Sequence, residues 1–229
     1  MSSMFQNLHY VYIALDTLLL TIWLIFYLVR KDLRHEILMI SILTIPLGLT
    51  QYFFGQDYWH PTYIMSFNFF GLEDLLYAFG VGGIAGVIYE EFLGKRFTKR
   101  HLPKHQYIAT ALTLGGLLAL FVGVNILHIN SIYVSSVVFL LAGLGAIIMR
   151  HDLFKQAFYS GVFLGVLTLL SEIFVVFLFP DFITKWWFLD NISRVFILEI
   201  PVEEILFAFA LGFVTGPIYE LVFGLRLQK

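Results

Sequence analysis

Seven long apolar runs constrain the fold of this chain more than any other feature. Each run approaches or exceeds the roughly 20 residues that a helix needs to cross a bilayer; they cover residues 11–29, 37–54, 63–93, 107–127, 132–149, 158–179 and 195–223. The runs are continuously apolar rather than alternating, which predicts helices and not a membrane barrel. The sequence therefore predicts an all-α fold, a seven-transmembrane helical bundle.

Composition excludes several classes of protein. The chain has 229 residues, of which 59% are hydrophobic and 13% charged, more apolar surface than a soluble domain can bury. The net charge of −2 makes a nucleic-acid partner unexpected, and the absence of Cys excludes disulfides and thiolate metal sites. Residues 1–10 hold no Lys or Arg, so the first run is not expected to be a cleaved signal peptide. We expect an integral membrane protein of a prokaryotic-type plasma membrane, with the lipid bilayer as a partner.

Positive charge predicts the orientation of the bundle. Of the 14 Lys and Arg residues, only Lys185 and Arg194 fall in loops on one side of the predicted membrane. The other cations follow the first, third, fifth and seventh runs. Because cytoplasmic loops carry the excess of Lys and Arg, we expect the N-terminus outside and the C-terminus inside.

An internal repeat divides the chain. The segments beginning at Phe70 and Ile200 align without a gap, and they pair Glu73 with Glu203 and Gly82 with Gly212. Runs 1–3 thus repeat as runs 5–7, which predicts three-helix units at residues 1–100 and 129–229 joined by a connector helix within 101–128. Equivalent helices are four crossings apart, so both halves run the same way, as in parallel transporter repeats.

Acids inside the apolar runs are the candidate catalytic residues, because a charge in hydrocarbon costs at least about 2.5–3.5 kcal/mol. Four of them form two matched pairs, Glu73–Asp74 and Glu203–Glu204. Pro201 predicts a break that brings a helix N-terminus beside its pair. A buried carboxyl tends to keep its proton, since burial disfavours the charged form, and can then protonate an alkene. The alternative is a hydrogen-bonded cluster that only locks the two halves together.

Other side chains support this site or have simpler roles. We expect Asp16 to be structural and Glu90, Glu91 and Glu220 to be solvated anchors at the inner ends of their helices. Some aromatic rings in the runs can stabilise a carbocation or stack on a polyene, whereas most, including Trp186 and Trp187, are expected to face lipid or the interface. The candidate substrate-binding residues are Tyr77, Phe79, Phe207, Phe209 and Glu172, although Glu172 taken singly slightly favours a structural role.

The duplicated acid motif resembles that of the integral-membrane lycopene cyclase family, the heterodimeric or fused carotenoid cyclases of bacteria, archaea and fungi. That family carries Pro-x-Glu-(Glu/Asp) followed by aromatics, once in each three-helix half. The second copy here, which starts at Pro201 and continues to Phe207 and Phe209, matches fully. The first copy has Gly71 in place of Pro.

The resemblance implies acid-catalysed cyclisation of the acyclic end group of lycopene or a related polyisoprenoid, with no net redox change. A carboxylic acid protonates a terminal double bond, the chain closes onto the cation, and a base removes a proton. The resemblance makes Glu73, Asp74, Glu203 and Glu204 the acid/base candidates and implies no cofactor and no metal. Such chemistry needs a dry pocket, because water would capture the cation.

Two other functions remain open: a non-catalytic carotenoid- or retinoid-binding membrane protein, and a proton-coupled transporter, which the parallel repeat and buried acids also suit. Covalent retinal binding is not expected, because residues 195–223 hold no Lys for a Schiff base. A prenyl-transfer enzyme is disfavoured by the lack of paired Asp-rich motifs for Mg²⁺ and diphosphate. The sequence leaves the oligomeric state open.

Overall fold

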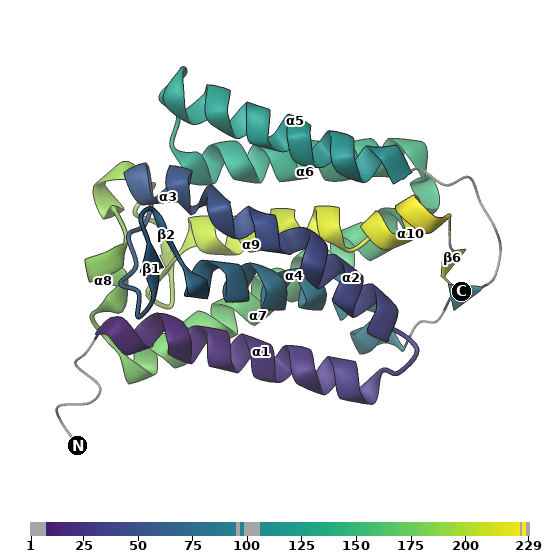
Figure 1. Cartoon of the computed structure of the whole chain (residues 1–229), viewed down its shortest axis with the longest axis horizontal. Helices are drawn as coiled ribbons and strands as arrows, with labels where there is room; N and C mark the ends of the chain where they lie inside the picture. The colour runs from purple at the N-terminus through teal and green to yellow at the C-terminus, as the bar shows by residue number, and fades with distance from the viewer. Residues whose placement is uncertain (1–7, 95–96, 99–105, 225, 228–229) are drawn as a thin grey trace.

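Helices dominate the fold of the protein. The computed structural model describes residues 8–94, 97–98, 106–224 and 226–227. Its α-helices are α1 (Val11–Val29), α2 (Arg34–Thr44), α3 (Gln51–Asp57), α4 (Leu72–Leu93), α5 (Gln106–Asn125), α6 (Ser131–Met149), α7 (Phe154–Leu178), α8 (Phe182–Trp186), α9 (Val202–Thr215) and α10 (Ile218–Phe223). Short 3-10 helices are η1 (Leu8–Tyr10), η2 (Ile45–Thr50), η3 (His151–Leu153) and η4 (Leu189–Asn191). The long helices run side by side along one direction (Figure 1).

Six stretches of helix are long and apolar enough to cross a membrane. They are Leu8–Val29, Arg34–Asp57, Leu72–Leu93, Ser131–Met149, His151–Leu178 and Val202–Phe223. A shorter apolar helix, Thr110–Asn125, lies within α5. The predicted helical integral membrane protein is therefore confirmed, with six candidate spans among the described residues.

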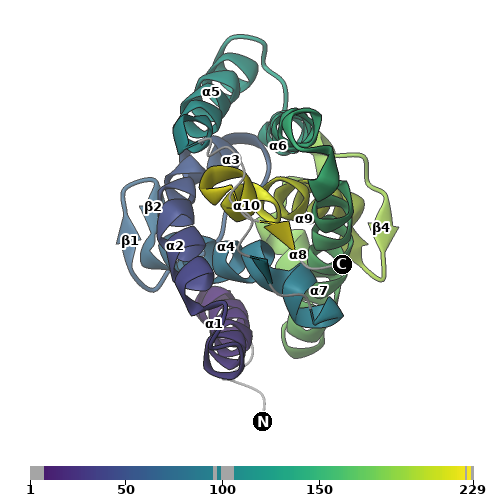
Figure 2. The ribbon, with the colours of Figure 1, turned by 90° about the vertical axis from the view of Figure 1, so that its right-hand side faces the viewer.

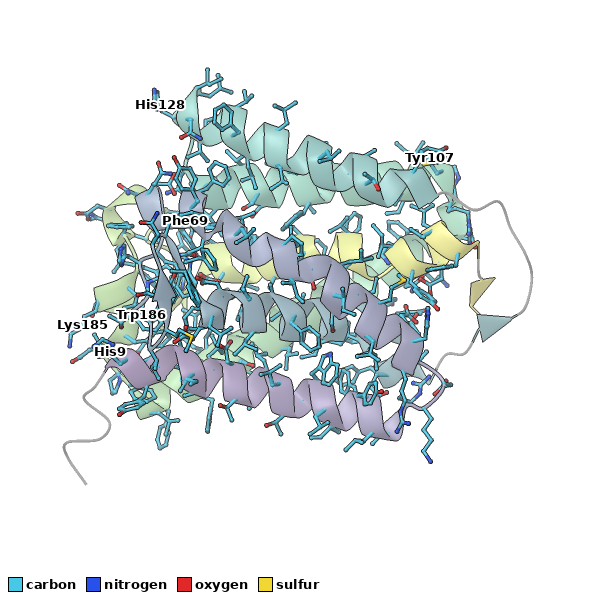
Figure 3. The ribbon with its side chains drawn as sticks, in the orientation of Figure 1. His9, Phe69, Tyr107, His128, Lys185 and Trp186 are labelled. Atoms are coloured by element: carbon cyan, nitrogen blue, oxygen red, sulfur yellow. The ribbon has the colours of Figure 1, made fainter. Side chains whose placement is uncertain are left out.

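The labelled residues in Figure 3 distinguish the two ends of the bundle. His9, His128 and Lys185 lie at the end where α8 lies, and Tyr107 lies at the opposite end (Figure 3). Several cations that support the predicted orientation lie outside the described residues: Lys95, Arg96, Lys99, Arg100, Lys104 and Lys229.

Two of the predicted runs are not helical at their beginnings. Helices α4 and α9 start at Leu72 and Val202, and the residues before them form the hairpins β1 (Ser66–Phe67)/β2 (Phe70–Gly71) and β4 (Phe196–Ile197)/β5 (Ile200–Pro201). Asn68 and Leu198 adopt φ of 57° and 51°, the left-handed conformation that reverses a chain tightly. Apolarity alone does not reveal such a turn, so the prediction that the third and seventh runs are helical from residues 63 and 195 is wrong for their first residues, whereas the predicted break before the second acid pair is present at Pro201.

The two hairpins share one register. Ser66 pairs with Gly71 in the first, and Phe196 pairs with Pro201, 130 residues later, in the second. A third two-stranded ladder joins β3 (Phe97–Thr98) to β6 (Arg226–Leu227), so the segments that follow α4 and α10 meet at the end of the bundle opposite the hairpins (Figure 1). The local structures of the aligned segments are thus alike.

Glycines bring the central helices into close contact. A Cβ on Gly82 of α4 would lie 2.0 Å from the Thr44 Oγ1, and one on Gly212 of α9 would lie 2.5 Å from the Ser160 carbonyl oxygen. Helix α4 therefore packs tightly on α2, and α9 packs tightly on α7 (Figure 2). These contacts agree with the expectation that small residues let membrane helices approach closely.

The second apolar run is interrupted by the 3-10 helix η2, which positions the candidate site. Pro46 stands at the start of η2, and a Cβ on Gly48 would lie 2.7 Å from the Asp74 carbonyl oxygen. Gly48 therefore allows η2 to lie directly against the first turn of α4, where the first acid pair stands.

The acids at the opposite end of the bundle are buried rather than solvated. Glu90 and Glu220 are both 0% exposed, and Gln156 Nε2 donates to Glu90 Oε1 at 2.8 Å. Glu91 is partly exposed and pairs with Arg30 at 3.3 Å. The prediction of a solvated role is therefore wrong for Glu90 and Glu220, because other helices pack over these parts of α4 and α10.

Candidate active site

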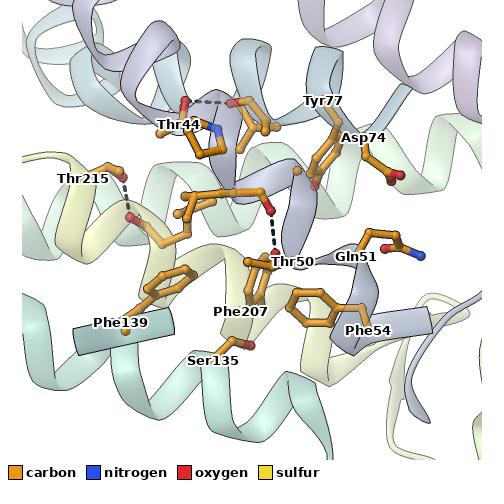
Figure 4. Close-up of a pocket in the computed structure, with 18 of the residues that line it drawn as sticks. Thr44, Thr50, Gln51, Phe54, Asp74, Tyr77, Ser135, Phe139, Phe207 and Thr215 are labelled. Atoms are coloured by element: carbon orange, nitrogen blue, oxygen red, sulfur yellow. Dashed lines mark hydrogen bonds between the residues drawn. The ribbon is translucent and has the colours of Figure 1, made fainter. Parts of the chain in front are cut away.

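An apolar cavity of about 490 Å³ lies among α2, η2, α3, α4, α5, α6 and α9. Its walls are mainly aliphatic and aromatic, and the acids that line it among the described residues are Asp74, Glu172 and Glu204. Figure 4 shows Asp74 and Tyr77 on one side of this space and Phe139 and Phe207 on the other. The two sequence motifs thus line one cavity from helices that lie far apart in the sequence.

Both carboxyl oxygens of Asp74 accept a hydrogen bond. It lies in the first turn of α4 and is 3% exposed. Tyr12 Oη donates to Asp74 Oδ1 at 2.8 Å, and the Gly71 backbone N–H donates to Oδ2 at 2.7 Å. The positive end of the α4 dipole also favours negative charge at this position. The arrangement suits a carboxylate.

Glu204 is held differently. It lies in the first turn of α9, and its Oε1 accepts hydrogen bonds from Tyr58 Oη at 2.7 Å and Trp187 Nε1 at 2.9 Å. Burial, and then the neighbouring Glu204, raises the pKa of the Tyr58 phenol, so the phenol keeps its proton and donates. Since both donors converge on Oε1, neither bonds Oε2.

Two loops supply these donors and are tied to each other. The Phe188 N–H donates to the Tyr58 carbonyl at 2.8 Å, and the His60 N–H donates to the Trp186 carbonyl at 2.7 Å. The segment after α3 and the segment around the end of α8 are therefore joined where Tyr58, Trp186 and Trp187 line the cavity. Trp186 and Trp187 are 3% and 7% exposed, so the prediction that this pair faces lipid or the interface is wrong.

Glu172 of α7 adjoins Glu204 and lines the same cavity. It lies outside the matched motifs, and only its position inside an apolar run marked it in the sequence. The structure places it beside the second acid of the second motif. Asp16 is also buried, at 1% exposure, but it is not among the described residues that line the cavity.

The first acid of each motif holds a loop instead of lining the cavity. Glu73 Oε1 accepts from the Ile64 N–H at 2.6 Å. Glu203 Oε1 accepts from the Ser193 N–H at 2.8 Å and from Tyr133 Oη at 2.9 Å. Neighbouring residues on a helix point about 100° apart, which explains why the two acids of a pair face different surroundings.

The predicted aromatic residues divide in the same way. Tyr77 and Phe207 line the cavity. Phe79 packs against Trp23, with ring centroids 5.1 Å apart, and Phe209 packs against Phe158 and Phe213. The structure therefore brings together one aromatic from each motif with the acids and leaves the other in helix packing.

The hydrogen-bond donors to the acids lie far from them in the sequence or in other segments of the fold. Tyr12, Tyr58 and Trp187 lie 62, 146 and 17 residues from the acids that they contact, and no local pattern links them. Among the described residues, no group of three or more His, Asp or Glu is placed to hold a metal ion.

Comparison with known proteins identifies one family. The family model described as lycopene cyclase matches residues 9–92 and 130–222, which together make up most of the chain and include both acid motifs. No curated protein and no solved structure matches the chain.

Proposed function

Because the chain belongs to the lycopene cyclase family, we propose that it is a membrane-embedded carotenoid cyclase that closes the acyclic end group of lycopene or a related polyisoprenoid. One observation carries the proposal: Asp74 and Glu204, from the two matched motifs, line a single apolar cavity. The reaction is an isomerisation, in which one proton enters the substrate and one leaves it.

We assign the proton donor to Glu204. Its Oε1 accepts two hydrogen bonds, which leaves Oε2 to carry a proton. Glu172 adjoins this group, and two neighbouring buried carboxyls hold a proton between them, since like charges in a dry site disfavour ionisation of both. Glu204 transfers this proton to a carbon of the terminal double bond. The electron pair of a second double bond then attacks the resulting cation, and the ring C–C bond forms.

We assign the base to Asp74. Neutral donors bond both of its oxygens, which favours the carboxylate that attracts the ring cation and accepts a proton from the carbon next to it. The C–H bonding electrons become the ring double bond. The proton returns from Asp74 to Glu204 before the next turnover, so the enzyme is restored without a redox partner.

The cavity walls protect the cation. Tyr77 and Phe207 line the same cavity as the acids, and aromatic rings can stabilise positive charge by cation–π attraction. The aliphatic lining excludes water, which would otherwise trap the cation as an alcohol. The local environment thus favours ring closure over hydration.

The proposal includes a seven-span topology, with the N-terminus outside, in a prokaryotic-type plasma membrane. Two three-helix units, within residues 1–100 and 129–229, are joined by α5. The shared register of the two hairpins supports the parallel repeat, as does the division of the family match into two parts on either side of α5. The distribution of Lys and Arg supports the orientation.

Expression in cells that accumulate lycopene tests the function. We expect cyclic products in pigment extracts separated by chromatography. Lack of ring formation by the wild type at good membrane expression would overturn the cyclase assignment. A copurified polyene that stays acyclic would instead support a binding protein, and proton-driven uptake into vesicles would support a transporter.

A further inference from the structure

The cavity described above has one exposed side. Most of its lining residues are buried or partly buried, including all of those on α4, α6, α7 and α9. The described lining residues that are exposed come only from α2, η2 and α5: Ile42, Leu43, Pro46, Thr110, Leu114 and Leu117. The cavity therefore opens to the surface of the protein between α2–η2 and α5.

On the α2–η2 side this opening lies near the middle of the candidate span Arg34–Asp57, and five of the six exposed lining residues are apolar. Ile42 follows the first residue of the span Arg34–Asp57 by eight positions, and Pro46 precedes its last residue by eleven. The opening therefore faces the hydrocarbon part of the bilayer, where water is scarce. A ligand that arrives through it comes from the lipid phase.

The acids lie at the end of the cavity lined by η2, α3 and α8, and Asp74 lies on the other side of the cavity from Thr44, the neighbour of Leu43 in α2 (Figure 4). Beyond them stand the buried aromatic side chains Tyr12, Tyr58 and Trp187, which line that end. The lining extends from Glu204 to Ile218 along α9 and α10, which is about 20 Å at a helical rise of 1.5 Å per residue. The space is therefore a long channel with one blind, acidic end.

We propose that α2–η2 and α5 form a lateral portal through which a linear polyisoprenoid enters from the bilayer end-first. One end group lies at Asp74 and Glu204, and the rest of the hydrocarbon chain runs along α9 and leaves between Leu43 and Leu114. This inference rests on the proposed function. It makes the enzyme act on one end of its substrate at a time, since only one end of a linear chain can reach the blind end.

One substitution on each side of the portal tests the inference. The double variant Leu43→Trp/Leu114→Trp narrows the opening without touching the acids. Leu118→Trp is the matched control, because Leu118 lies on the same helix and is 64% exposed, against 63% for Leu114, yet does not line the cavity. Thermal unfolding and membrane yield are measured for each variant to establish that it is folded.

The readouts separate entry from chemistry. In liposomes that contain lycopene, we expect the double variant to form cyclic product at least about tenfold more slowly than the wild type, and Leu118→Trp to match the wild type. The same pair of Trp substitutions is then combined with Glu204→Gln, which prevents turnover. We expect this variant, captured on an affinity resin, to acquire lycopene more slowly than Glu204→Gln alone.

Different results overturn different claims. A folded double variant that acquires and converts lycopene at the wild-type rate overturns the portal. An equal loss in Leu118→Trp does the same, since the effect would not be specific to the opening. If the wild type acquires lycopene without cyclising it, the proposed function fails, and the acquisition rates still decide whether the portal exists.

Discussion

The two acid motifs stand at equivalent places, the first turns of α4 and α9, yet they hold their cavity-facing acids in different ways. Asp74 accepts from the backbone N–H of Gly71, the residue before its own helix. Pro201 occupies the matching position in the second motif and has no N–H to donate. Glu204, whose side chain is one methylene longer, bonds donors from other segments. The two motifs therefore differ: each carboxyl oxygen of Asp74 accepts a hydrogen bond, whereas Tyr58 and Trp187 both donate to the same oxygen of Glu204.

The departure from the family motif at Gly71 has a steric cause. A Cβ on Gly71 would lie 2.1 Å from Cδ1 of the Tyr63 ring, so no other residue fits without movement of that ring. In the second half Ser193 stands 130 residues after Tyr63, and this small side chain has no ring to exclude Pro201. The sequence therefore differs between the two segments at both positions, Tyr63 against Ser193 and Gly71 against Pro201.

Replacement of Glu204 should have the largest effect. Glu204→Gln keeps an acceptor for Tyr58 and Trp187 but cannot deliver an acidic proton, so we expect cyclisation to fall by about 10³-fold, within the range for general acid catalysis. Product formation per folded protein, measured on pigment extracts, checks this. Lycopene should still copurify with the variant; activity close to wild type would refute the assignment of the donor.

Replacement of Asp74 should have a smaller effect. Asp74→Asn removes the base and the negative charge near the cation, and we expect a loss of about 10²-fold, because the cation can still lose a proton to another acceptor. Glu204→Gln and Asp74→Asn are assayed side by side with lycopene. If Asp74→Asn loses more activity than Glu204→Gln, the roles of the two halves are the reverse of those proposed.

The lengths of the apolar runs and the alignment of two segments of the sequence predicted much of this arrangement. Continuous runs predicted the helices, and the repeat brought forward the four motif acids, because buried charge is rare enough in hydrocarbon to be conspicuous. The sequence could not separate Asp74 from Glu73, since the direction of each side chain depends on where its helix begins. Hairpins hidden in apolar runs, and donors such as Tyr58 that lie far away in the chain, depend on tertiary contacts that a local pattern does not contain.

The difference between Gly71 and Pro201 can be tested by placing proline at both positions. Gly71→Pro removes the N–H that donates to Asp74 and places ring atoms against Tyr63, so we expect it to destabilise the protein by about 2 kcal/mol, as an overpacked site with a lost hydrogen bond does. Thermal unfolding in detergent measures the loss. Adding Tyr63→Ser, which copies the second half, should restore part of the stability; no recovery in the double variant would mean that the ring is not the obstacle.

The first acid of each motif offers the finest test, because the structure gives Glu73 and Glu203 the same task in both halves. Each holds loop backbone through Oε1, and an amide can still accept that hydrogen bond, though without the extra strength of a charged acceptor. We therefore expect Glu73→Gln and Glu203→Gln to destabilise the protein by about 1 kcal/mol each, with product formation per folded protein within a few-fold of wild type. Thermal unfolding and the pigment assay, run on the same preparations, separate the two effects. A loss of activity in either variant as large as that of Glu204→Gln would show that the first acids also take part in the reaction. The proposal that the first acid of each motif only holds a loop would then be wrong.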